Sequence, residues 1–294
     1  MQIPSGLDWW RNEPGGSEWL ARLPRLVREC AELWSLDVGE PLEPGHISLV
    51  LPATTADGTD VVLKLNFPEP ESEHEAEALE HWSGEGAVRL LEHDPARRAL
   101  LLERCRPGTE LWSVAEEPAD AIAAGVLRTL WRPAPREHRY RLLAGEAERW
   151  ADELPGRWER LRRPFEEALL AAAVTRAREL GADQGEPVVL HQDFHGGNVL
   201  LSDRGWLAID PKPLVGEREF DLASYLRDRR DELARDPDAG SRVRRRLDQL
   251  TSELGLDRER ARGWGIVHAL AWGVTEDDVD PEHVACARWL LQAG

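Results

Sequence analysis

The sequence predicts an α+β fold with two lobes, a small β-rich lobe followed by a larger helical lobe. The chain has 294 residues, which is long for one compact domain and natural for two lobes that share a cleft. Short apolar runs separated by turn residues fill the first hundred positions. After Arg106-Pro107-Gly108 the composition shifts to Ala, Leu, Arg and Glu, which favour helix. We therefore expect one lobe over residues 1–104 and the other over residues 105–294.

The first lobe is expected to begin with a helical extension and to continue as a sheet. Apolar residues recur at helical spacing between Leu23 and Cys30, which predicts a helix near residues 16–35. The tight-turn dipeptide Asp57-Gly58 lies between two apolar runs and predicts a β-hairpin. The expected elements of this sheet region are hairpin strands at 47–51 and 61–65, a Glu/Ala-rich helix over 72–82, and two further strands at 88–91 and 99–102, joined at Asp94-Pro95.

The second lobe is expected to be helical on both sides of a short β-like section. Residues 111–181 are mostly helical by composition, residues 187–210 are strand-like, and helices resume near residue 220. This alternation places a polar loop between two apolar runs in the middle of the lobe.

Composition limits the class of partner. The net charge of −18 repels nucleic acid and favours polycationic ligands, although solubility alone explains it equally well. No apolar run reaches the roughly 18 residues that span a bilayer, and Met1 to Ser5 do not resemble a signal peptide. Three widely spaced cysteines suit a reducing compartment. We expect a cytoplasmic monomer or dimer with no nucleic-acid or membrane partner.

The polar loop carries the residues best suited to chemistry. Asp193 and Asn198 lie five residues apart in the segment from Val188 to Leu201, and Asp210 ends the next apolar run. Two adjacent strands could present all three side chains to one point. One carboxylate could take a proton from an acceptor hydroxyl, while an amide oxygen and a second carboxylate could hold Mg²⁺ on a triphosphate. Alternatively, Asp193 and Asn198 are turn residues around Gly196-Gly197.

Two histidines in the same loop suggest a competing interpretation. His191, Asp193 and His195 alternate and could form a transition-metal hydrolase site. No further histidine-rich cluster follows, and such a site would leave Asn198 and Asp210 without a role. We therefore expect His191 to hydrogen-bond the loop backbone.

The pattern His191-x-Asp193-x-x-x-x-Asn198, followed by Ile209-Asp210, resembles the catalytic and metal-binding segments of protein kinases and antibiotic phosphotransferases. The variant Asp210-Pro211-Lys212-Pro213 with Phe220-Asp221-Leu222 is similar to the aminoglycoside/hydroxyurea resistance kinase family. Further similarity lies in Gly6 to Trp10, in Pro14-Gly15-Gly16 and in the segment from His74 to Leu91, so the resemblance covers nearly the whole chain.

This resemblance implies a protein-kinase-like fold and a set of site residues. Asp193 would be catalytic, Asn198 and Asp210 would bind Mg²⁺, and His191 and Asp221 would support the loop, although Asp221 could instead cap a helix. Lys64 would hold the nucleotide phosphates, paired with Glu75 or, as the alternative, Glu77. Backbone groups of Glu103 to Cys105 would meet the nucleobase, and Ser48 would assist phosphate binding in the segment from Pro44 to Ser48, which lacks a glycine-rich pattern.

The expected activity is transfer of the γ-phosphoryl group of ATP or GTP to a hydroxyl of a small cationic substrate such as streptomycin, or to hydroxyurea. Two alternatives stay open: a metabolic kinase for an amino alcohol or sugar, and a pseudokinase that binds nucleotide without transfer. Possible substrate contacts are carboxylates beside tryptophan at 150–153 and 272–278, which equally suit exposed acids beside core aromatics.

Overall fold

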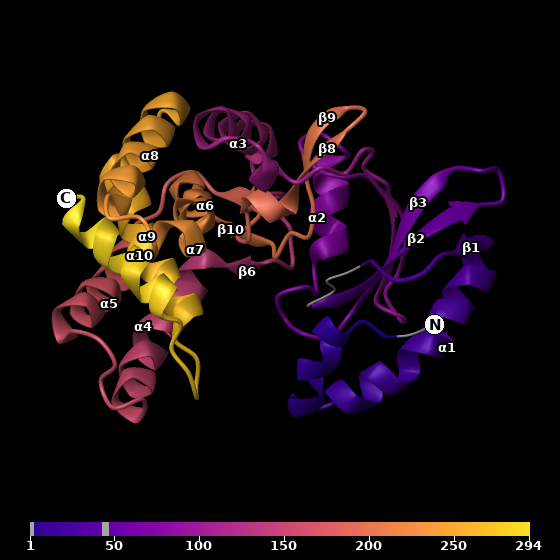
Figure 1. Ribbon diagram of the computed structural model, residues 1–294, viewed down its shortest axis with the longest axis horizontal. Coiled ribbons are helices and arrows are strands. Elements are labelled where there is room, and N and C mark those ends of the chain that lie inside the picture. The colour runs from indigo at the N-terminus through magenta and orange to yellow at the C-terminus, as the bar shows by residue number, and fades with distance from the viewer. Residues whose placement is uncertain (1–2, 43–46) are drawn as a thin grey trace. The chain divides into compact units, whose positions relative to one another are not determined.

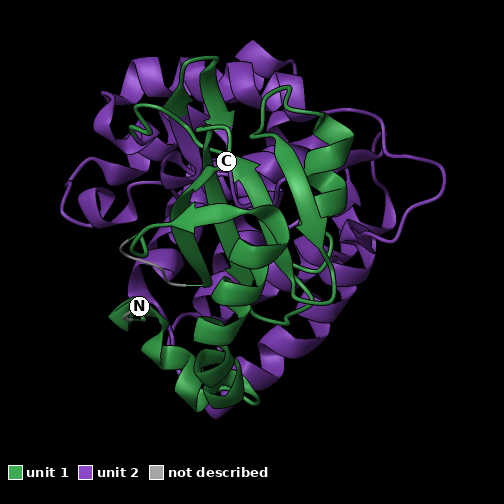
Figure 2. Ribbon diagram, turned by 90° about the vertical axis from the view of Figure 1, so that its right-hand side faces the viewer, with its two compact units in different colours: residues 1–109, 201–207 green, residues 110–200, 208–294 purple. Residues whose placement is uncertain are grey.

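The computed structural model describes residues 3–42 and 47–294 and confirms the α+β class. The chain divides into two compact units, coloured separately in Figure 2: residues 1–109 with 201–207, and residues 110–200 with 208–294. The division expected from the sequence lies after residue 104, with residues 201–207 in the second lobe.

The first unit is built on a five-stranded antiparallel sheet (Figure 1). Its strands, in spatial order, are β1 (Leu36–Val38), β2 (Ser48–Thr55), β3 (Asp60–Asn66), β5 (Ala99–Glu103) and β4 (Leu90–Asp94). The predicted hairpin is the β2–β3 pair, in which Val50 lies opposite Lys64. Strand β4 begins two residues later than predicted and continues to Asp94, and its pairing with β5 shifts register between Leu90 and Glu92.

Helix α1 (Gly16–Trp34) covers one face of this sheet, after a short 3₁₀ helix η1 (Ser5–Asn12). Leu63 and Leu65 of β3 are fully buried in the cluster that α1 completes. Because side chains alternate along a strand, Lys64 points to the opposite face of the sheet. Helix α2 (Glu75–Trp82) lies within its reach there. The predicted helix over 72–82 thus begins at Glu75, after a turn in which Glu75 N donates to Ser72 O.

Residues 201–207 join the first unit through contacts that are distant in sequence. They form the turn region of the hairpin β8 (Val199–Ser202) and β9 (Gly205–Ala208). Gly108 N donates to Leu201 O at 3.0 Å, and Arg204 Nη1 donates to Gly84 O at 2.8 Å. Arg204 also pairs with the Glu103 carboxylate. Composition gives no sign of these contacts, because they depend on how the hairpin packs.

The second unit is helical around a small sheet of strands β6 (Arg141–Leu142), β10 (Leu214–Gly216) and β7 (Val188–Leu190). Helix α9 (Arg258–Gly273) is buried without interruption from Ala261 to Leu270, as expected of a helix surrounded by other helices. The other helices of the unit are α3 (Glu116–Leu130), α4 (Leu143–Arg160), α5 (Glu167–Ala182), α6 (Leu222–Leu226), α7 (Arg230–Leu233), α8 (Ala239–Leu254) and α10 (Pro281–Gln292).

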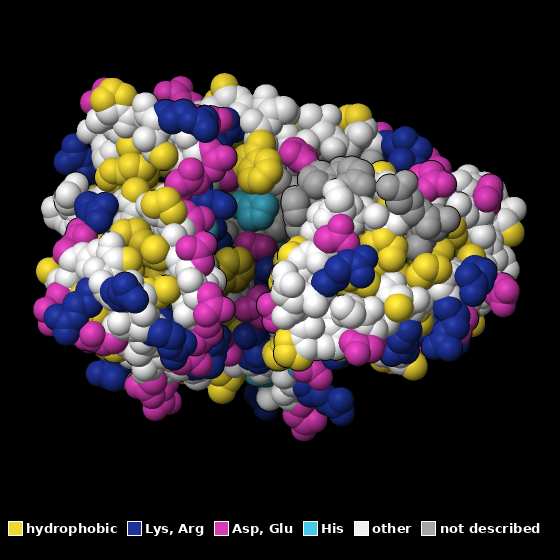
Figure 3. Space-filling model, turned by 60° about the horizontal axis from the view of Figure 1, so that its bottom comes forward, with side chains coloured by type: hydrophobic (Ala, Val, Ile, Leu, Met, Phe, Trp, Pro, Cys, Tyr) yellow, Lys and Arg dark blue, Asp and Glu magenta, His cyan; other side chains and the backbone are white. Residues whose placement is uncertain are grey.

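Within residues 3–42 and 47–294, no helix is both long enough and apolar enough to cross a bilayer. Acidic and basic side chains are intermixed over the face of the molecule drawn in Figure 3. The net charge of −18 is therefore not gathered into one acidic patch on that face.

Candidate active site

The carboxylate of Asp221 binds the backbone at the start of the polar loop between β7 and β8. Asp221 Oδ2 accepts from His191 N at 3.1 Å, and Asp221 Oδ1 accepts from Gln192 N at 2.8 Å. Trp131, at the end of α3, donates its Nε1 to the same carboxylate at 3.1 Å. Asp221 therefore braces the loop and does not cap the following helix, whose first turn receives no side-chain hydrogen bond from it. Burial raises the pKa of Asp221 to about 6, against the opposing effect of these donors.

Two residues of this region adopt left-handed backbone conformations without being glycine. Gln192 has φ 67° and Asp210 has φ 56°. Such conformations are disfavoured for residues with a Cβ and persist where surrounding contacts enforce them. The Asp221 hydrogen bond holds the Gln192 backbone, and Arg141 Nη2 donates to Gln192 Oε1 at 3.2 Å. Directly after Gln192, the chain turns Asp193 to its position.

A chain of hydrogen bonds ties Asn198 to both Asp193 and the end of β9. Asn198 Nδ2 donates to Asp193 O at 2.9 Å, and Ile209 N donates to Asn198 O at 2.9 Å. His191 Nε2 lies 2.9 Å from Ile209 O. The residue that precedes Asp210 is thus bound to the loop on both sides. The three residues predicted from their spacing share one hydrogen-bonded framework.

The donor set of this framework fits a hard cation. Because Asn198 uses its amide nitrogen to bind Asp193 O, its amide oxygen is the atom that could hold a metal ion, together with the Asp210 carboxylate. The hydrolase interpretation fails on geometry: His191 Nε2 meets a backbone carbonyl, and His195 Nδ1 accepts from Gly197 N at 3.1 Å. In the described part of the chain, no group of three His, Cys, Asp or Glu side chains could hold a metal ion.

Asp193 is buried beside two cations that the sequence analysis did not assign to the site. Lys212 Nζ lies 3.5 Å from Asp193 Oδ2, and Arg227 Nη2 lies 3.9 Å from Asp193 Oδ1. Burial raises the pKa of Asp193, but the neighbouring positive charges, first among them that of Lys212, outweigh burial and hold the pKa below its ordinary value. The carboxylate is therefore ionised at neutral pH, as a group that accepts a proton must be.

Trp272 binds the chain's own cations. Lys212 Nζ lies 4.7 Å from the centre of its ring, and the Arg227 guanidinium lies 5.1 Å from it. The nearby candidate Trp150 is buried and stacks on Phe220. Trp150 thus serves the core and Trp272 the cations beside Asp193, and nothing in these contacts marks them as substrate ligands.

Trp112 forms a further aromatic contact with the loop. It lies in the 3₁₀ helix η2 (Leu111–Ser113), is half exposed, and stacks on His195 with ring centres 5.2 Å apart. Asp228 holds both sides of this contact: it accepts from Trp112 Nε1 at 2.5 Å and from Gly196 N at 2.9 Å. A Cβ at Gly197 would lie 2.7 Å from the Trp112 ring, so glycine is required where the indole covers the loop.

The first unit holds the remaining predicted residues. Lys64 Nζ donates to both carboxylate oxygens of Glu75, at 2.6 and 2.7 Å, and both side chains are buried. Glu77 instead faces His74 at 3.4 Å and is largely exposed. Asn66 Nδ2 donates to Glu75 Oε2 at 2.7 Å, and Ser48 Oγ donates to Asn66 Oδ1 at 2.7 Å.

Ser48 therefore supports the Lys64–Glu75 pair through Asn66, and its direct contact with phosphate stays a prediction. Residues 44–46 of the expected phosphate-covering segment lie outside the described residues.

The expected nucleobase segment follows β5. The Glu103 carboxylate accepts from Arg89 N at 2.8 Å and pairs with Arg204, so this side chain is used inside the unit. Burial raises the pKa of the Cys105 thiol to about 11, which makes it an unreactive side chain. Contact of these residues with a nucleobase stays a prediction.

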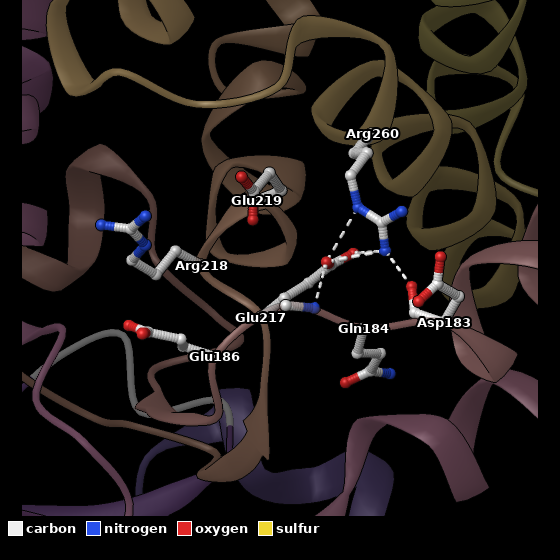
Figure 4. A pocket seen from close by; sticks show the side chains of 8 residues that line it. Asp183, Gln184, Glu186, Glu217, Arg218, Glu219 and Arg260 are labelled. Atoms are coloured by element: carbon white, nitrogen blue, oxygen red, sulfur yellow. Dashed lines mark hydrogen bonds and ion pairs between the residues drawn. The ribbon is translucent and has the colours of Figure 1, made fainter.

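A cavity of about 310 Å³ is lined by residues 183–186, residues 217–219 and Arg260 (Figure 4). Its central side chain is Glu217, which is fully buried and pairs with Arg260. Glu217 also accepts from Gly185 N at 3.0 Å and from Trp264 Nε1. These contacts join α9 to the loops that line the cavity, and none of the predicted site residues lies in it.

Sequence reasoning thus missed Lys212, Arg227 and Trp112. For Lys212 a signal was present: it is one of only two lysines in the chain, the other being Lys64. For Arg227 and Trp112 the sequence offers no comparable signal, because arginine and tryptophan are both abundant here.

With this geometry established, the chain can be compared with known proteins. Residues 34–279 match the family described as aminoglycoside/hydroxyurea antibiotic resistance kinase. The streptomycin 6-kinase of Streptomyces glaucescens is 39% identical over 283 residues, covering 94% of this chain and 91% of that protein. The hydroxyurea phosphotransferase of Kitasatospora aureofaciens is 41% identical over 288 residues, covering 94% of this chain and 81% of that protein.

Solved structures show the same fold at low sequence identity. A thermostable mutant of aminoglycoside phosphotransferase APH(4)-Ia, in a ternary complex with ADP and hygromycin B, superposes with a TM-score of 0.61. The match covers 91% of this chain and 98% of that chain, with 16% identity. The protein-kinase-like fold expected from the sequence is thereby confirmed.

Proposed function

Since the chain belongs to the aminoglycoside/hydroxyurea antibiotic resistance kinase family and is thus a small-molecule phosphotransferase, we propose that it transfers the γ-phosphoryl group of ATP or GTP to a hydroxyl of an aminoglycoside such as streptomycin, or to hydroxyurea. The observation that carries this proposal is the buried, ionised Asp193, fixed by a loop that Asp221 braces and that Asn198 ties to the end of β9.

Asp193 acts on the acceptor. Its carboxylate orients the acceptor hydroxyl and takes the proton as the oxygen attacks phosphorus. The low pKa of Asp193 keeps it ionised before transfer. Because the backbone on both sides of Asp193 is hydrogen-bonded, the carboxylate needs little reorganisation to reach its working position, and positioning supplies a large share of the rate.

Each unit carries groups suited to a nucleotide. In the first unit, Lys64 holds the phosphates, and the buried Glu75 fixes the direction of its ammonium group. In the second unit, the amide oxygen of Asn198 and the carboxylate of Asp210 are the groups that would hold Mg²⁺. When bound, Mg²⁺ would neutralise phosphate charge and orient the triphosphate for in-line transfer.

The proposed class of acceptor is inferred from the similar proteins and from the net charge of this chain. Streptomycin kinases and a hydroxyurea phosphotransferase are similar to this chain along nearly its whole length. The net charge of −18 favours approach of a cationic antibiotic over an anionic substrate. These two observations rank streptomycin before hydroxyurea and before neutral sugars.

The test is Mg²⁺-dependent release of nucleoside diphosphate, with ATP or GTP, across streptomycin, other aminoglycosides, hydroxyurea and simple amino alcohols. We expect stimulation by streptomycin, lost about 10²–10⁴-fold in Asp193→Asn and Asp193→Ala. Nucleotide binding, measured by calorimetry, should survive in both variants. Asp210→Ala should weaken Mg²⁺–nucleotide binding as well as transfer.

The matched control is Asp203→Asn, which removes an exposed carboxylate from the β8–β9 turn and should leave turnover unchanged. Near-normal turnover of Asp193→Asn would refute the catalytic role of Asp193. Stimulation by an amino alcohol alone would replace the antibiotic by a metabolic acceptor. Nucleotide binding without transfer to any acceptor would refute the proposed activity and support a pseudokinase.

A further inference from the structure

The indole of Trp112 is the exposed end of a row of three side chains that begins at Asp193. The side chain of Asp193 is 12% exposed, and His195 Nε2 lies 3.8 Å from its Oδ1. The side chain of His195 is 25% exposed, and the Trp112 ring stacks on the imidazole with ring centres 5.2 Å apart. Trp112 itself is 45% exposed, and all three residues belong to the second unit. The exposed surface therefore continues from the Asp193 carboxylate to the indole.

The Trp112 ring is held in place by the protein although much of it is exposed. Its Nε1 donates to Asp228 Oδ1 at 2.5 Å. The backbone of its 3₁₀ helix η2 is held by Arg229, whose Nη2 donates to Val114 O at 2.5 Å. Gly196 leaves room for the ring, because a Cβ at that position would collide with the indole. An aromatic ring that is exposed and already immobilised loses little conformational entropy when a ligand packs on it.

The charges around Asp193 indicate from which side a cationic acceptor can reach it. Lys212 and Arg227 lie beside its two carboxylate oxygens, and both of these cations are buried. Approach of another cation from their side meets repulsion. His195 adds no positive charge, because its Nδ1 accepts a backbone N–H and therefore carries no proton. The side that His195 and Trp112 form is thus both more exposed and free of the repulsion.

We propose that the exposed side of the Trp112 ring binds a planar cationic group, of the guanidinium class, on an acceptor whose hydroxyl lies at Asp193. This inference rests on the proposed function and names the class of acceptor for it. The face of an indole attracts cations, and a planar guanidinium can also stack on it. The carboxylate of Asp228, bound to the indole Nε1, adds negative charge beside the ring.

The two acceptors suggested by similar proteins differ in this respect. Streptomycin carries guanidinium groups. Hydroxyurea is uncharged, and it is too small to contact Trp112 while its hydroxyl lies at Asp193, because His195 lies between the two. Trp112 therefore favours the binding of streptomycin and leaves that of hydroxyurea unaffected.

The test measures release of nucleoside diphosphate by wild type, Trp112→Leu and Trp112→Phe at increasing concentrations of streptomycin. Leucine keeps an apolar cover on the loop without an aromatic face, whereas phenylalanine keeps the face. We expect the KM for streptomycin to rise about 5–30-fold in Trp112→Leu and to stay within about threefold of wild type in Trp112→Phe. The KM for nucleotide should stay within about twofold in both variants. So should the rate of nucleotide hydrolysis without acceptor, in which water replaces the hydroxyl.

The matched control is Trp9→Leu. Trp9 is also a half-exposed tryptophan, 40% exposed, but it belongs to the first unit and stacks on Trp10. Its replacement should leave the KM for streptomycin, the KM for nucleotide and the rate of hydrolysis unchanged.

The outcomes separate this inference from the proposed function. If wild type releases no nucleoside diphosphate with any acceptor or with water, the proposed function fails and this inference fails with it. Turnover of hydroxyurea but not of streptomycin would leave the phosphotransferase standing and overturn the cationic class. If wild type phosphorylates streptomycin and Trp112→Leu keeps its KM within about twofold, only the role of Trp112 is overturned.

A purely structural role of Trp112 gives a different result. In that case kcat would fall equally with streptomycin and with water at an unchanged KM for streptomycin, and this inference would be overturned. Should Trp112→Leu not fold, Trp112→Met, which is also apolar and has no ring, replaces it with the same expected rise in KM.

Discussion

The Lys64–Glu75 pair allows a sharp test of how the first unit is built. The perturbation is a double-mutant cycle of Lys64→Met, Glu75→Gln and the two together. Lys64 is 5% exposed and Glu75 is fully buried, so each single substitution leaves one buried charge without its counter-charge. The glutamine keeps an oxygen for Asn66 Nδ2, which now donates to Glu75 Oε2.

The expected magnitude follows from burial. Breaking a buried ion pair by removing one partner costs about 3–5 kcal/mol, because the remaining charge stays desolvated. Removing both charges leaves no such charge, so we expect the double variant to lose at least about 2 kcal/mol less than the sum of the single losses. Arg11 and Asp8 form a pair in which both side chains are 56% exposed, and the same cycle there should give a coupling of at most about 1 kcal/mol.

Native-state hydrogen exchange at the amides of β3 is the appropriate assay. It reports the opening free energy of the first unit alone, whereas a single unfolding curve of a chain with two compact units mixes both. Additive losses in the Lys64–Glu75 cycle, equal to those of the exposed pair, would refute the argument that this pair is a desolvated, tightly coupled unit.

Three further predictions concern the loop and the lysines. Burial lowers the pKa of His191 to about 4, so between about pH 4 and 6.5 the unfolded chain binds more protons than the folded chain. The contribution of His191 to the free energy of unfolding is therefore complete above pH 6.5. It falls as the pH decreases toward 4, by up to about 1.4 kcal/mol per pH unit. Native-state hydrogen exchange at the amides of β7, measured against pH, should show this slope reduced in His191→Gln, and an unchanged slope would contradict it. Gly197→Ala forces a Cβ against the Trp112 ring and should cost the second unit about 1–3 kcal/mol, with a fall in kcat. Gly125→Ala, which has open space in α3, should be neutral or stabilising. Native-state hydrogen exchange at amides of the second unit measures both changes. Acetic anhydride, with mass spectrometry as the readout, should label Lys64 and Lys212 slowly because both side chains are buried. Mg²⁺–nucleotide should slow the labelling of Lys64 further. Fast labelling of Lys64 with nucleotide present would argue against its contact with phosphate.

The sequence predicted most elements because their signals are local. Helix α1 occupies Gly16–Trp34 against a predicted 16–35. The Asp57-Gly58 hairpin forms as expected, with strands Ser48–Thr55 and Asp60–Asn66 against the predicted 47–51 and 61–65. Apolar spacing and turn dipeptides act within a few residues, so the elements that they predict depend little on how the rest of the chain packs. The prediction is wrong in the bounds of β4, which covers Leu90–Asp94 instead of residues 88–91 and pairs with β5 through a register shift.

The candidate site divides in the same way. Asp193, Asn198 and Asp210 could be predicted from their spacing in the sequence because one loop and one hairpin carry all three residues. Their local framework requires only hydrogen bonds across that hairpin, such as Ile209 N to Asn198 O. The choice of Glu75 over Glu77 was also local, because it depends on which face of one short helix points to β3.

Only the tertiary structure decided the surroundings of Asp193. Arg227, which follows α6, reaches this carboxylate, and Trp272 at the end of α9 contacts both cations. Residues 201–207 join the first unit, where Arg204 contacts Glu103 and Gly84. Each of these contacts joins segments separated by tens of residues, and its formation depends on the angles at which helices and strands pack. A sequence pattern specifies what one segment can do, whereas the electrostatic environment of a buried carboxylate is the sum over every segment packed against it.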